Sequence, residues 1–172
     1  MPLPELNRIG KLPGKRWEDL KQLRLEALEN VPSAFGSSLE EERRLPEKVW
    51  RERIKSVLIA FSEGKPVGMV SYVFNERVKT KHVAHIYGVY VTQKHRGQGM
   101  GQMLMDRALF EIRKNRNIVK VQLSVNPLLR TAVSLYKGEG FEVVGRARKD
   151  LKIGRRYFDL LLMEKEIRKV PG

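Results

Sequence analysis

Hydrophobic residues recur at helical spacing in several segments of the chain. Residues 17–30, with tryptophan, leucine and alanine on one face, predict an amphipathic helix that ends at Pro32. The same spacing predicts helices over residues 99–114 and 127–137. A shorter helix is predicted over residues 46–56, because it begins with a proline and proline favours the first turn. About four helices are therefore expected.

Stretches rich in β-branched and aromatic residues predict strands between these helices. They cover residues 57–62, 67–74, 82–91, 118–125, 141–144 and 157–163. The first two flank the turn E-G-K-P and so predict a hairpin. The order α-α-β-β-β-α-β-α-β-β is that of a mixed α/β domain, with no internal repeat or linker. We expect one domain over residues 1–172.

Length and composition are those of an ordinary globular domain. In a chain of 172 residues, about 68–70% of the surface can be buried on folding, and 41% of these residues are hydrophobic. The absence of cysteine excludes disulfides, thiolate zinc sites and a cysteine nucleophile. The N-terminus has no apolar run of signal-peptide length, and no stretch approaches the ~18 apolar residues of a membrane span. We therefore expect a cytoplasmic protein that does not enter a membrane.

Positive charge is concentrated in the second part of the chain. The net charge is +14, and residues 61–172 hold 22 of the 34 Lys and Arg but 10 of the 20 Asp and Glu. Such a field attracts anions, which include nucleic acid, an acidic membrane and a polyphosphate cofactor. A solvated surface without a partner is equally compatible with it. The basic residues are scattered over several predicted elements and form no nucleic-acid recognition motif, so charge alone identifies no partner.

Three glycines, Gly97, Gly99 and Gly101, alternate directly behind Arg96, where a predicted strand meets a helix. Each glycine costs a helix about 0.5–1 kcal/mol relative to alanine, so a merely flexible turn is the weaker explanation. A turn without side chains at a helix N-terminus presents unpaired backbone N–H groups to a phosphate. The segment lacks G-K-[ST] and the G-x-G-x-x-G spacing, which excludes a Walker loop and a dinucleotide fingerprint. It predicts a phosphate-binding turn of another kind.

The run R-G-Q-G-M-G (Arg96–Gly101) is similar to the Q/R-x-x-G-x-G/A signature of the GNAT superfamily of acetyl-CoA-dependent N-acetyltransferases. The flanking runs I-Y-G-V-Y-V-T-Q-K-H-R and G-Q-M-L-M-D-R-A-L also resemble the family, as does V-Q-L-S-V-N-P-L-L-R-T-A-V-S-L-Y-K-G-E-G-F further on. The resemblance implies a GNAT-like fold, with a twisted, mostly antiparallel sheet of about six or seven strands and a splayed central strand pair. It also implies transfer of an acetyl group from acetyl-CoA to a primary amine, without a metal.

The resemblance assigns one set of residues to acetyl-CoA. This set is Val89, Tyr90, Val91, Arg96, Gly97, Gln98, Gly99, Met100, Gly101, Gln102, Asn126, Ala132 and Tyr136. The N–H groups of residues 97–102 are expected to hold the pyrophosphate together with Arg96, and the strand end to pair with the pantetheine arm. Many members carry an asparagine where this chain has Leu129, so that contact is either missing or supplied by Asn126. Candidates for the adenosine 3′-phosphate are Lys94, His95, Arg130 and Lys137.

Acetyl transfer to an amine needs a base, an oxyanion donor and an acid for the departing thiolate. The family's usual acid corresponds to Tyr136, for which a packed core tyrosine is the alternative. Some members carry a glutamate base at the position of His85, which can accept a proton near neutrality or be purely structural. Glu40–Glu42 are further candidates for the base, unless they form a solvated acidic helix face. The N–H of Val89 or Tyr90 is the expected oxyanion donor.

The acceptor itself is not identified by these motifs. Phe35, Tyr87 and Tyr157 are expected to line its site, and Phe35 belongs to R-L-E-A-L-E-N-V-P-S-A-F-G-S, which resembles the family's acceptor-side segment. No metal site is expected, because the three histidines lack ligand spacing. Three functions stay open: an N-acetyltransferase, a non-catalytic acyl-CoA-binding module and a nucleic-acid-binding protein. A homodimer is an open alternative to a monomer.

Overall fold

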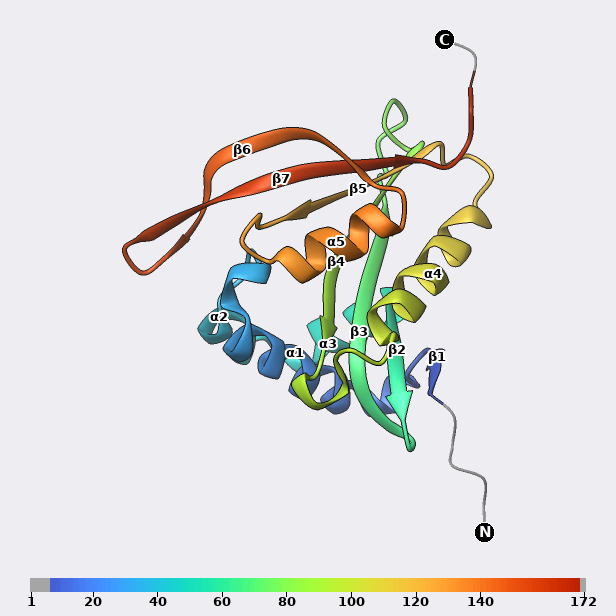
Figure 1. Ribbon diagram of the computed structural model, residues 1–172. Coiled ribbons are helices and arrows are strands. Elements are labelled where there is room, and N and C mark those ends of the chain that lie inside the picture. The colour runs from blue at the N-terminus through green and yellow to red at the C-terminus, as the bar shows by residue number, and fades with distance from the viewer. Residues whose placement is uncertain (1–6, 171–172) are drawn as a thin grey trace. The chain divides into compact units, whose positions relative to one another are not determined.

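The computed structural model of the chain describes residues 7–170. In chain order its helices and strands are β1 (Arg8–Gly10), α1 (Trp17–Asn30), α2 (Leu39–Arg43), α3 (Glu47–Arg53), β2 (Val57–Ser62), β3 (Lys65–Phe74), β4 (Val83–Val91), α4 (Met100–Arg113), β5 (Lys120–Val125), α5 (Arg130–Gly138), β6 (Glu142–Ile153) and β7 (Arg156–Glu166). The strands follow the order β1-β2-β3-β4-β5-β7-β6 in a seven-stranded sheet (Figure 1). β4 pairs with β5 in parallel, whereas β1–β2, β2–β3, β5–β7 and β6–β7 are antiparallel. The predicted fold class, mixed α/β with a mostly antiparallel sheet, is confirmed.

Two compact units divide the described chain. Their boundaries fall between Ser71 and Tyr72, between Tyr87 and Gly88, and between Ala108 and Leu109. The first unit therefore holds α1 to α3, β1, β2, most of β3, the end of β4 and the start of α4. The second holds the remainder of β3, β4 and α4, followed by β5, α5, β6 and β7. That residues 1–172 form a single domain stays a prediction.

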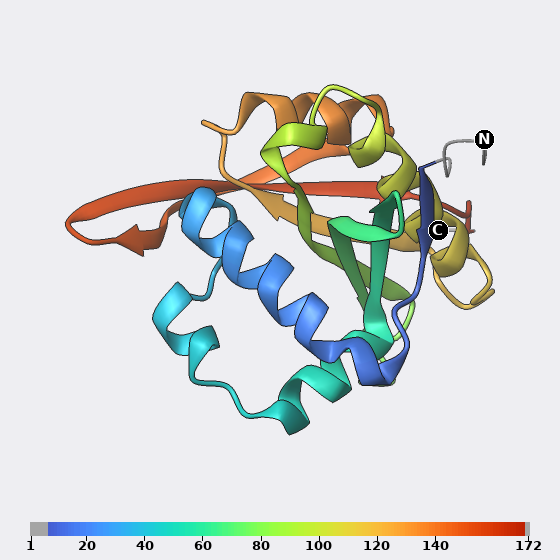
Figure 2. The same cartoon turned by 90° about the horizontal axis from the view of Figure 1, so that it is seen from below.

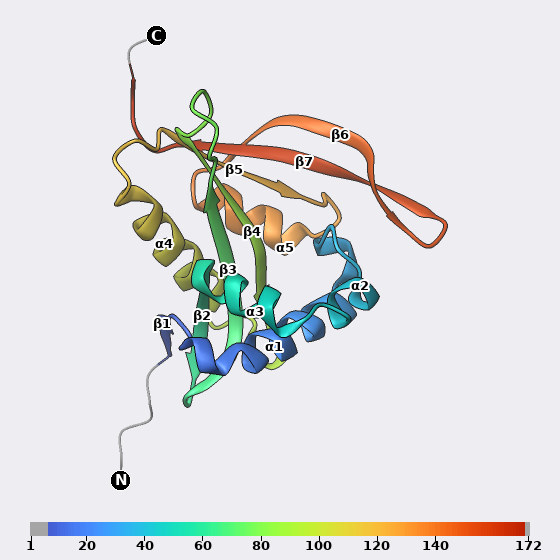
Figure 3. The ribbon, with the colours of Figure 1, turned by 180° about the vertical axis from the view of Figure 1, so that it is seen from behind.

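Helices cover both faces of the sheet in the first unit. Ile59 of β2 lies in a core cluster with Leu23 of α1 and Trp50 of α3. The opposite face packs against α4, since a Cβ added to Gly68 of β3 would lie 3.2 Å from Leu104. The two sides are seen in opposite views, with α4 in front of β2 in Figure 1 and α3 in front of it in Figure 3. β2 and the middle of β3 are apolar on both faces, because both faces are buried there.

The turn between β2 and β3 is tighter than predicted. Glu63 and Gly64 both have positive φ, 50° and 73°. Two consecutive left-handed residues match the right-handed twist of a hairpin, so a two-residue turn suffices. β3 consequently begins at Lys65 and includes Pro66, two positions before the predicted start.

The helix α2 was missed because its five residues, L-E-E-E-R, show no apolar stripe. A capping box starts it: Ser38 Oγ accepts from Glu41 N at 3.2 Å, and the Glu41 carboxylate accepts from Ser38 N at 2.8 Å. Figure 2 shows α2 in cyan beside α1 in blue. None of the helices in the described part of the chain has the length and apolar character needed to cross a bilayer.

The second unit ends in a long hairpin of β6 and β7, drawn in orange and red in Figure 1. β6 spans 12 residues and β7 spans 11, so the predictions of strands over residues 141–144 and 157–163 were too short. β6 is the outermost strand, and its pairing with β7 shifts register between Val143 and Gly145 and again between Ala147 and Leu151. Its charged middle is exposed and follows no period, which is why the pattern did not predict it.

The start of α5 also differs from prediction. The helix begins at Arg130 and not at Pro127, because the chain first turns on Asn126. The Asn126 carbonyl accepts from Leu129 N at 3.0 Å, and its side-chain Oδ1 accepts from Leu128 N at 2.9 Å. Asparagine favours such turns over helix, which delays the helix start.

Candidate active site

The glycine segment of the first unit joins the end of β4 to α4. Gly97 and Gly99 have φ of +74° and +78°, in the left-handed region that other residues rarely adopt. A Cβ added to either glycine would meet no atom within 4 Å, so the space beside them is open. Gly101 lies in the first turn of α4, where its backbone is helical. Backbone conformation, and not crowding, therefore requires glycine at the first two positions.

Backbone amides in this segment lack internal partners. Met103 N donates to the Gly99 carbonyl at 3.0 Å, but within residues 7–170 the amides of residues 97–101 have no hydrogen-bond acceptor. They sit at the N-terminus of the 14-residue helix α4, the positive end of its dipole. Exposed N–H donors at such an end bind phosphate. The structure thus has the local features that a pyrophosphate would need.

The end of β4 is tied to α1 through Tyr90, which is 4% exposed. The Tyr90 hydroxyl donates to Glu26 Oε1 at 2.8 Å and accepts from Asn30 Nδ2 at 3.1 Å. Burial and the neighbouring Glu26 raise the pKa of Tyr90, so its phenol is neutral. Arg96 Nε donates to the Val91 carbonyl at 2.9 Å, and its guanidinium lies 5.6 Å from the centre of the Tyr90 ring. Arg96 therefore holds the strand end in place, and among the described residues its terminal nitrogens have no hydrogen-bond partner.

β4 has only a short pairing with β5. The parallel register covers Val83–His85, opposite Lys120–Gln122, while β4 continues to Val91. Gly88, just before Val89, has a φ of +67°, in the left-handed region that favours glycine. The splayed strand pair that the resemblance implied stays a prediction.

Tyr136 lies on α5 in the second unit and is 7% exposed. Its ring meets that of Phe141 edge to face, with centroids 6.3 Å apart. Burial raises the pKa of Tyr136, so the phenol keeps its proton at neutral pH. In the part of the chain that the structure describes, its hydroxyl has no hydrogen-bond partner. A buried, neutral and unpaired phenol can donate a proton to a bound group.

Asn126 follows β5 and is 2% exposed. Its Oδ1 is bonded within the turn, but its Nδ2 has no partner among the described residues. A buried N–H without a partner costs about 1–3 kcal/mol, which a carbonyl oxygen of a ligand would recover. This donor stands three residues before Leu129, where the resemblance expects an asparagine. That Asn126 supplies this contact stays a prediction.

His85 is half-buried on β4, in register with Gln122. Burial and the charge of Lys120 lower the pKa of His85 below its ordinary value of 6.5. The imidazole is therefore neutral at pH 7 and able to accept a proton. Lys120 itself donates to Glu164 Oε1 at 2.8 Å.

The acidic run Glu40–Glu42 divides into two kinds of side chain. Glu40 and Glu41 are exposed, as the expected solvated face requires, but Glu42 is 1% exposed and corrects that expectation. Arg24 binds its carboxylate in bidentate fashion at 2.8 and 3.0 Å, and Arg53 adds a contact at 2.9 Å. Burial raises the pKa of Glu42, but these bonds and charges outweigh it and lower the pKa overall. Glu42 is a buried structural anion, because its oxygens are committed to arginines.

The remaining predicted residues are dispersed. Phe35 is 6% exposed and packs in the core cluster of the first unit, with the Arg24 guanidinium 4.5 Å from its ring centre. Tyr87 on β4 and Tyr157 on β7 are exposed, and Ala132 on α5 is half-buried. Lys94, Arg130 and Lys137 are exposed, and His95 bonds Thr92 Oγ1 through Nδ1 at 2.9 Å. The structure brings Tyr90, Val91 and Arg96 into direct contact.

Sequence reasoning did not identify the contact between Arg24 and Gly88. A Cβ on Gly88 would lie 3.3 Å from Arg24 Nη1. The available signal was that an arginine stands beside Leu23 in the apolar stripe of residues 17–30. A charged side chain at a position that faces the core is usually paired with another polar or charged group there.

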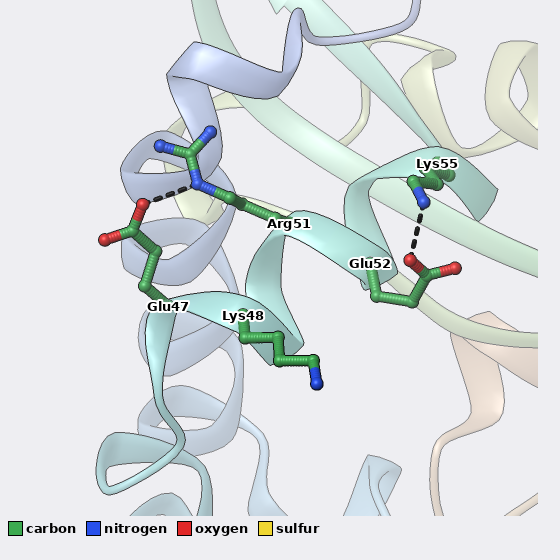
Figure 4. Close-up of a pocket in the computed structure, with 5 residues that line it drawn as sticks. All are labelled: Glu47, Lys48, Arg51, Glu52 and Lys55. Atoms are coloured by element: carbon green, nitrogen blue, oxygen red, sulfur yellow. Dashed lines mark hydrogen bonds and ion pairs between the residues drawn. The ribbon is translucent and has the colours of Figure 1, made fainter.

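A shallow pocket is lined by residues of α3 and by Lys55 just after it, and none of these is a predicted site residue. Its lining residues are Glu47, Lys48, Arg51, Glu52 and Lys55 (Figure 4). Arg51 pairs with Glu47 at 2.5 Å and Lys55 with Glu52 at 2.6 Å, so most of these charges satisfy one another. Within residues 7–170 no cluster of three or more histidine or acidic side chains could hold a metal ion.

Comparison with known proteins identifies the family. The model of the acetyltransferase (GNAT) family matches residues 17–141. An uncharacterized N-acetyltransferase of Methanocaldococcus jannaschii is 36% identical over 81 residues, 46% of this chain and 35% of that protein. The L-amino acid N-acetyltransferase AaaT of Escherichia coli is 27% identical over 121 residues, 67% of this chain and 74% of that protein. The structure of yncA from Salmonella typhimurium with its cofactor acetyl-CoA has a TM-score of 0.84 at 16% identity, with 98% of each chain covered. Because the family model covers well over half of its length, this chain belongs to the GNAT family of acetyltransferases.

Proposed function

We propose that the chain transfers the acetyl group of acetyl-CoA to a primary amine, by direct attack in a ternary complex. The glycine segment carries this proposal, because its left-handed glycines, open space and unpaired amides suit a pyrophosphate. Membership of the family and the acetyl-CoA in the yncA structure support the same donor.

In this proposal, the residues that bind acetyl-CoA or move protons have the following roles. The amides of residues 97–102 and the terminal nitrogens of Arg96 hold the pyrophosphate, and Asn126 Nδ2 bonds a carbonyl of the pantetheine arm. The N–H of Val89 or Tyr90 stabilises the oxyanion as the amine attacks the thioester carbon. The C–S bond then breaks, and the Tyr136 hydroxyl gives its proton to the thiolate. His85 takes the proton that the amine loses.

Tyr136→Phe is expected to lower kcat by about 10- to 100-fold and to leave the affinity for acetyl-CoA unchanged. The phenylalanine ring keeps the packing against Phe141 but has no proton to give. The loss is at the low end for a general acid, because thiolates leave readily. Steady-state kinetics and calorimetry measure the two quantities. An unchanged kcat would assign Tyr136 to the core alone.

The rate is expected to depend on the protonation of His85. Because its pKa lies below 6.5, the neutral base persists at lower pH than for an ordinary histidine, and the acid limb of kcat/KM is expected below pH 6.5. His85→Gln should remove this limb and reduce the rate at pH 7 by about 10-fold. His82→Gln, an exposed position just before β4, is the matched control and should change neither. Identical profiles for the His85 variant and the parent would exclude His85 as the base.

Calorimetry with acetyl-CoA and CoA, followed by thiol release with a panel of amines, tests the proposed function. We expect saturable binding of both and acetyl-dependent thiol release with at least one amine. Absence of binding would overturn the proposal. Binding without thiol release for any amine would instead support a non-catalytic acyl-CoA-binding module.

A further inference from the structure

The guanidinium of Arg24 in α1 uses only part of its hydrogen-bonding capacity. Its Nε and Nη2 donate to the two oxygens of Glu42 at 3.0 and 2.8 Å, and Nη2 also reaches Ser37 Oγ at 3.1 Å. The plane of the group lies over the Phe35 ring. Among the described residues, Nη1 has no hydrogen-bond partner, and it faces Gly88 of β4. The bidentate pair fixes where Nη1 points, because the guanidinium is rigid.

Glycine at position 88 keeps side-chain atoms away from this nitrogen. A Cβ at Gly88 would lie 3.3 Å from Arg24 Nη1 and 3.6 Å from Ser71 Oγ of β3. Ser71 Oγ likewise has no partner within residues 7–170. Ser71 and Gly88 are half-buried, and the Arg24 side chain is 16% exposed, so a group from solvent can reach this point. Two hydrogen-bond donors therefore lie beside the position that a side chain at residue 88 would occupy.

The local charge favours an anionic oxygen. The single negative charge of Glu42 is shared by Arg24 and Arg53, so the three groups together are positive. A neutral carbonyl would accept the same hydrogen bonds but would gain less from this charge. Carboxylates form the stronger, charge-assisted bonds with guanidinium donors.

We propose that Arg24 Nη1 and Ser71 Oγ bind a carboxylate of the acceptor, which makes the acceptor an α-amino acid rather than an amine on a protein. The proposal rests on the proposed function, in which the N–H of Val89 or Tyr90 is the oxyanion donor. Gly88 stands directly before Val89 and Tyr90 in β4, so the carboxylate site and the proposed oxyanion donor are neighbours along the chain. An α-amino acid has its amine and carboxylate on one carbon, which suits two neighbouring sites.

Matched acceptors test this directly. The common L-amino acids, their carboxamides and the corresponding amines without the carboxyl group are compared by thiol release with saturating acetyl-CoA. For the preferred side chain, kcat/KM is expected to be about 10- to 100-fold higher for the amino acid than for its carboxamide. Equal values would overturn the carboxylate site while leaving acetyl transfer established.

Two variants and a control locate the effect. Ser71→Ala is expected to reduce the preference for the amino acid over its carboxamide by several-fold, with unchanged affinity for acetyl-CoA. Arg24→Lys keeps the positive charge beside Glu42 but removes Nη1, and should abolish the preference if circular dichroism shows a folded protein. Ser62→Ala, a half-buried serine on β2, is the control and should leave the preference intact. A preference unchanged in Ser71→Ala would contradict the proposal even if the arginine variant does not fold.

A readout independent of turnover separates the two proposals. Equilibrium dialysis with labelled amino acids in the presence of CoA is expected to show binding that Ser71→Ala weakens. If acetyl-CoA binds but no amine releases thiol, the proposed acetyl transfer fails, and dialysis still decides whether the carboxylate site exists. Absence of amino-acid binding in that case overturns the site as well.

Discussion

Gly99→Val is expected to weaken acetyl-CoA binding on the order of 10³-fold, because it changes both the backbone and the open space of the glycine segment. A β-branched residue at a φ of +78° is strained and would draw the chain out of the left-handed region. The amides of residues 97–101 would then lose their shared direction. Each charge-assisted bond is worth about 1.5–3 kcal/mol, so losing two accounts for this loss. Isothermal titration calorimetry measures it.

Gly154→Val is the matched control for this substitution. Gly154 lies between β6 and β7, has a φ of +59°, and would also place its Cβ in open space. The two variants should therefore lose similar amounts of unfolding free energy, about 1–3 kcal/mol. Only the Gly99 variant should lose affinity. Equal affinities for the two variants would show that the glycine segment does not bind the pyrophosphate.

Glu42→Ala is expected to destabilise the protein by about 3–5 kcal/mol, since it leaves the largely buried Arg24, and also the more exposed Arg53, without their shared anion. The Glu42 side chain is 1% exposed and the Arg24 side chain 16%. Glu40→Ala, on the same helix, is the control. The Glu40 side chain is 78% exposed, and its Oε2 lies 3.9 Å from Nη2 of Arg44, whose side chain is 83% exposed. That change should cost about 0–1 kcal/mol. Urea denaturation gives both values, and equal costs would contradict the buried role of Glu42.

The contribution of Glu42 to stability should also vanish in acid. The pKa of Glu42 is lower in the folded chain than its ordinary value of 4.5, so folding favours the ionised form. Ionised Glu42 therefore stabilises the folded chain fully at any pH above its ordinary pKa. This stabilisation is lost as the pH falls through the lower pKa that Glu42 has in the folded chain. The difference in unfolding free energy between the parent and Glu42→Ala should therefore shrink below pH 4.5. A difference that stays constant there would contradict this assignment.

Elements with one buried apolar face were predictable from sequence. The helix over residues 17–30 matches α1 to the residue, and the predicted strand over residues 57–62 matches β2, because burial imposes the spacing that the pattern records. β6 had no such constraint. Its middle is exposed and charged, and it is a strand because β7 supplies hydrogen bonds along its length. Backbone hydrogen bonds to a neighbouring strand do not require alternating apolar side chains, so an exposed strand shows little periodicity in its sequence.

In the candidate site, too, features set by consecutive residues could be predicted from the sequence, whereas contacts between distant residues could not. The glycine segment is local, so its conformation and its amides followed from consecutive residues. The relation of Arg24 to Glu42 and Gly88 is not local, since 18 residues separate the ion pair and Gly88 comes from a different strand. Glu40, Glu41 and Glu42 look alike in the sequence. Only packing shows that the third carboxylate is buried.

The irregular pairing of β6 has a consequence for solubility at high concentration. An outermost strand exposes a row of N–H and C=O groups to which a second molecule can add a strand. One of its register shifts falls at Val143, beside the exposed Val144, where such addition would be most favourable. The other precedes Leu151, with Lys149 at a φ of 55° between. The two register shifts bend the edge of β6, and the surrounding arginines and lysines make it positively charged. Both features oppose the addition of strands from other molecules, and so oppose fibril formation.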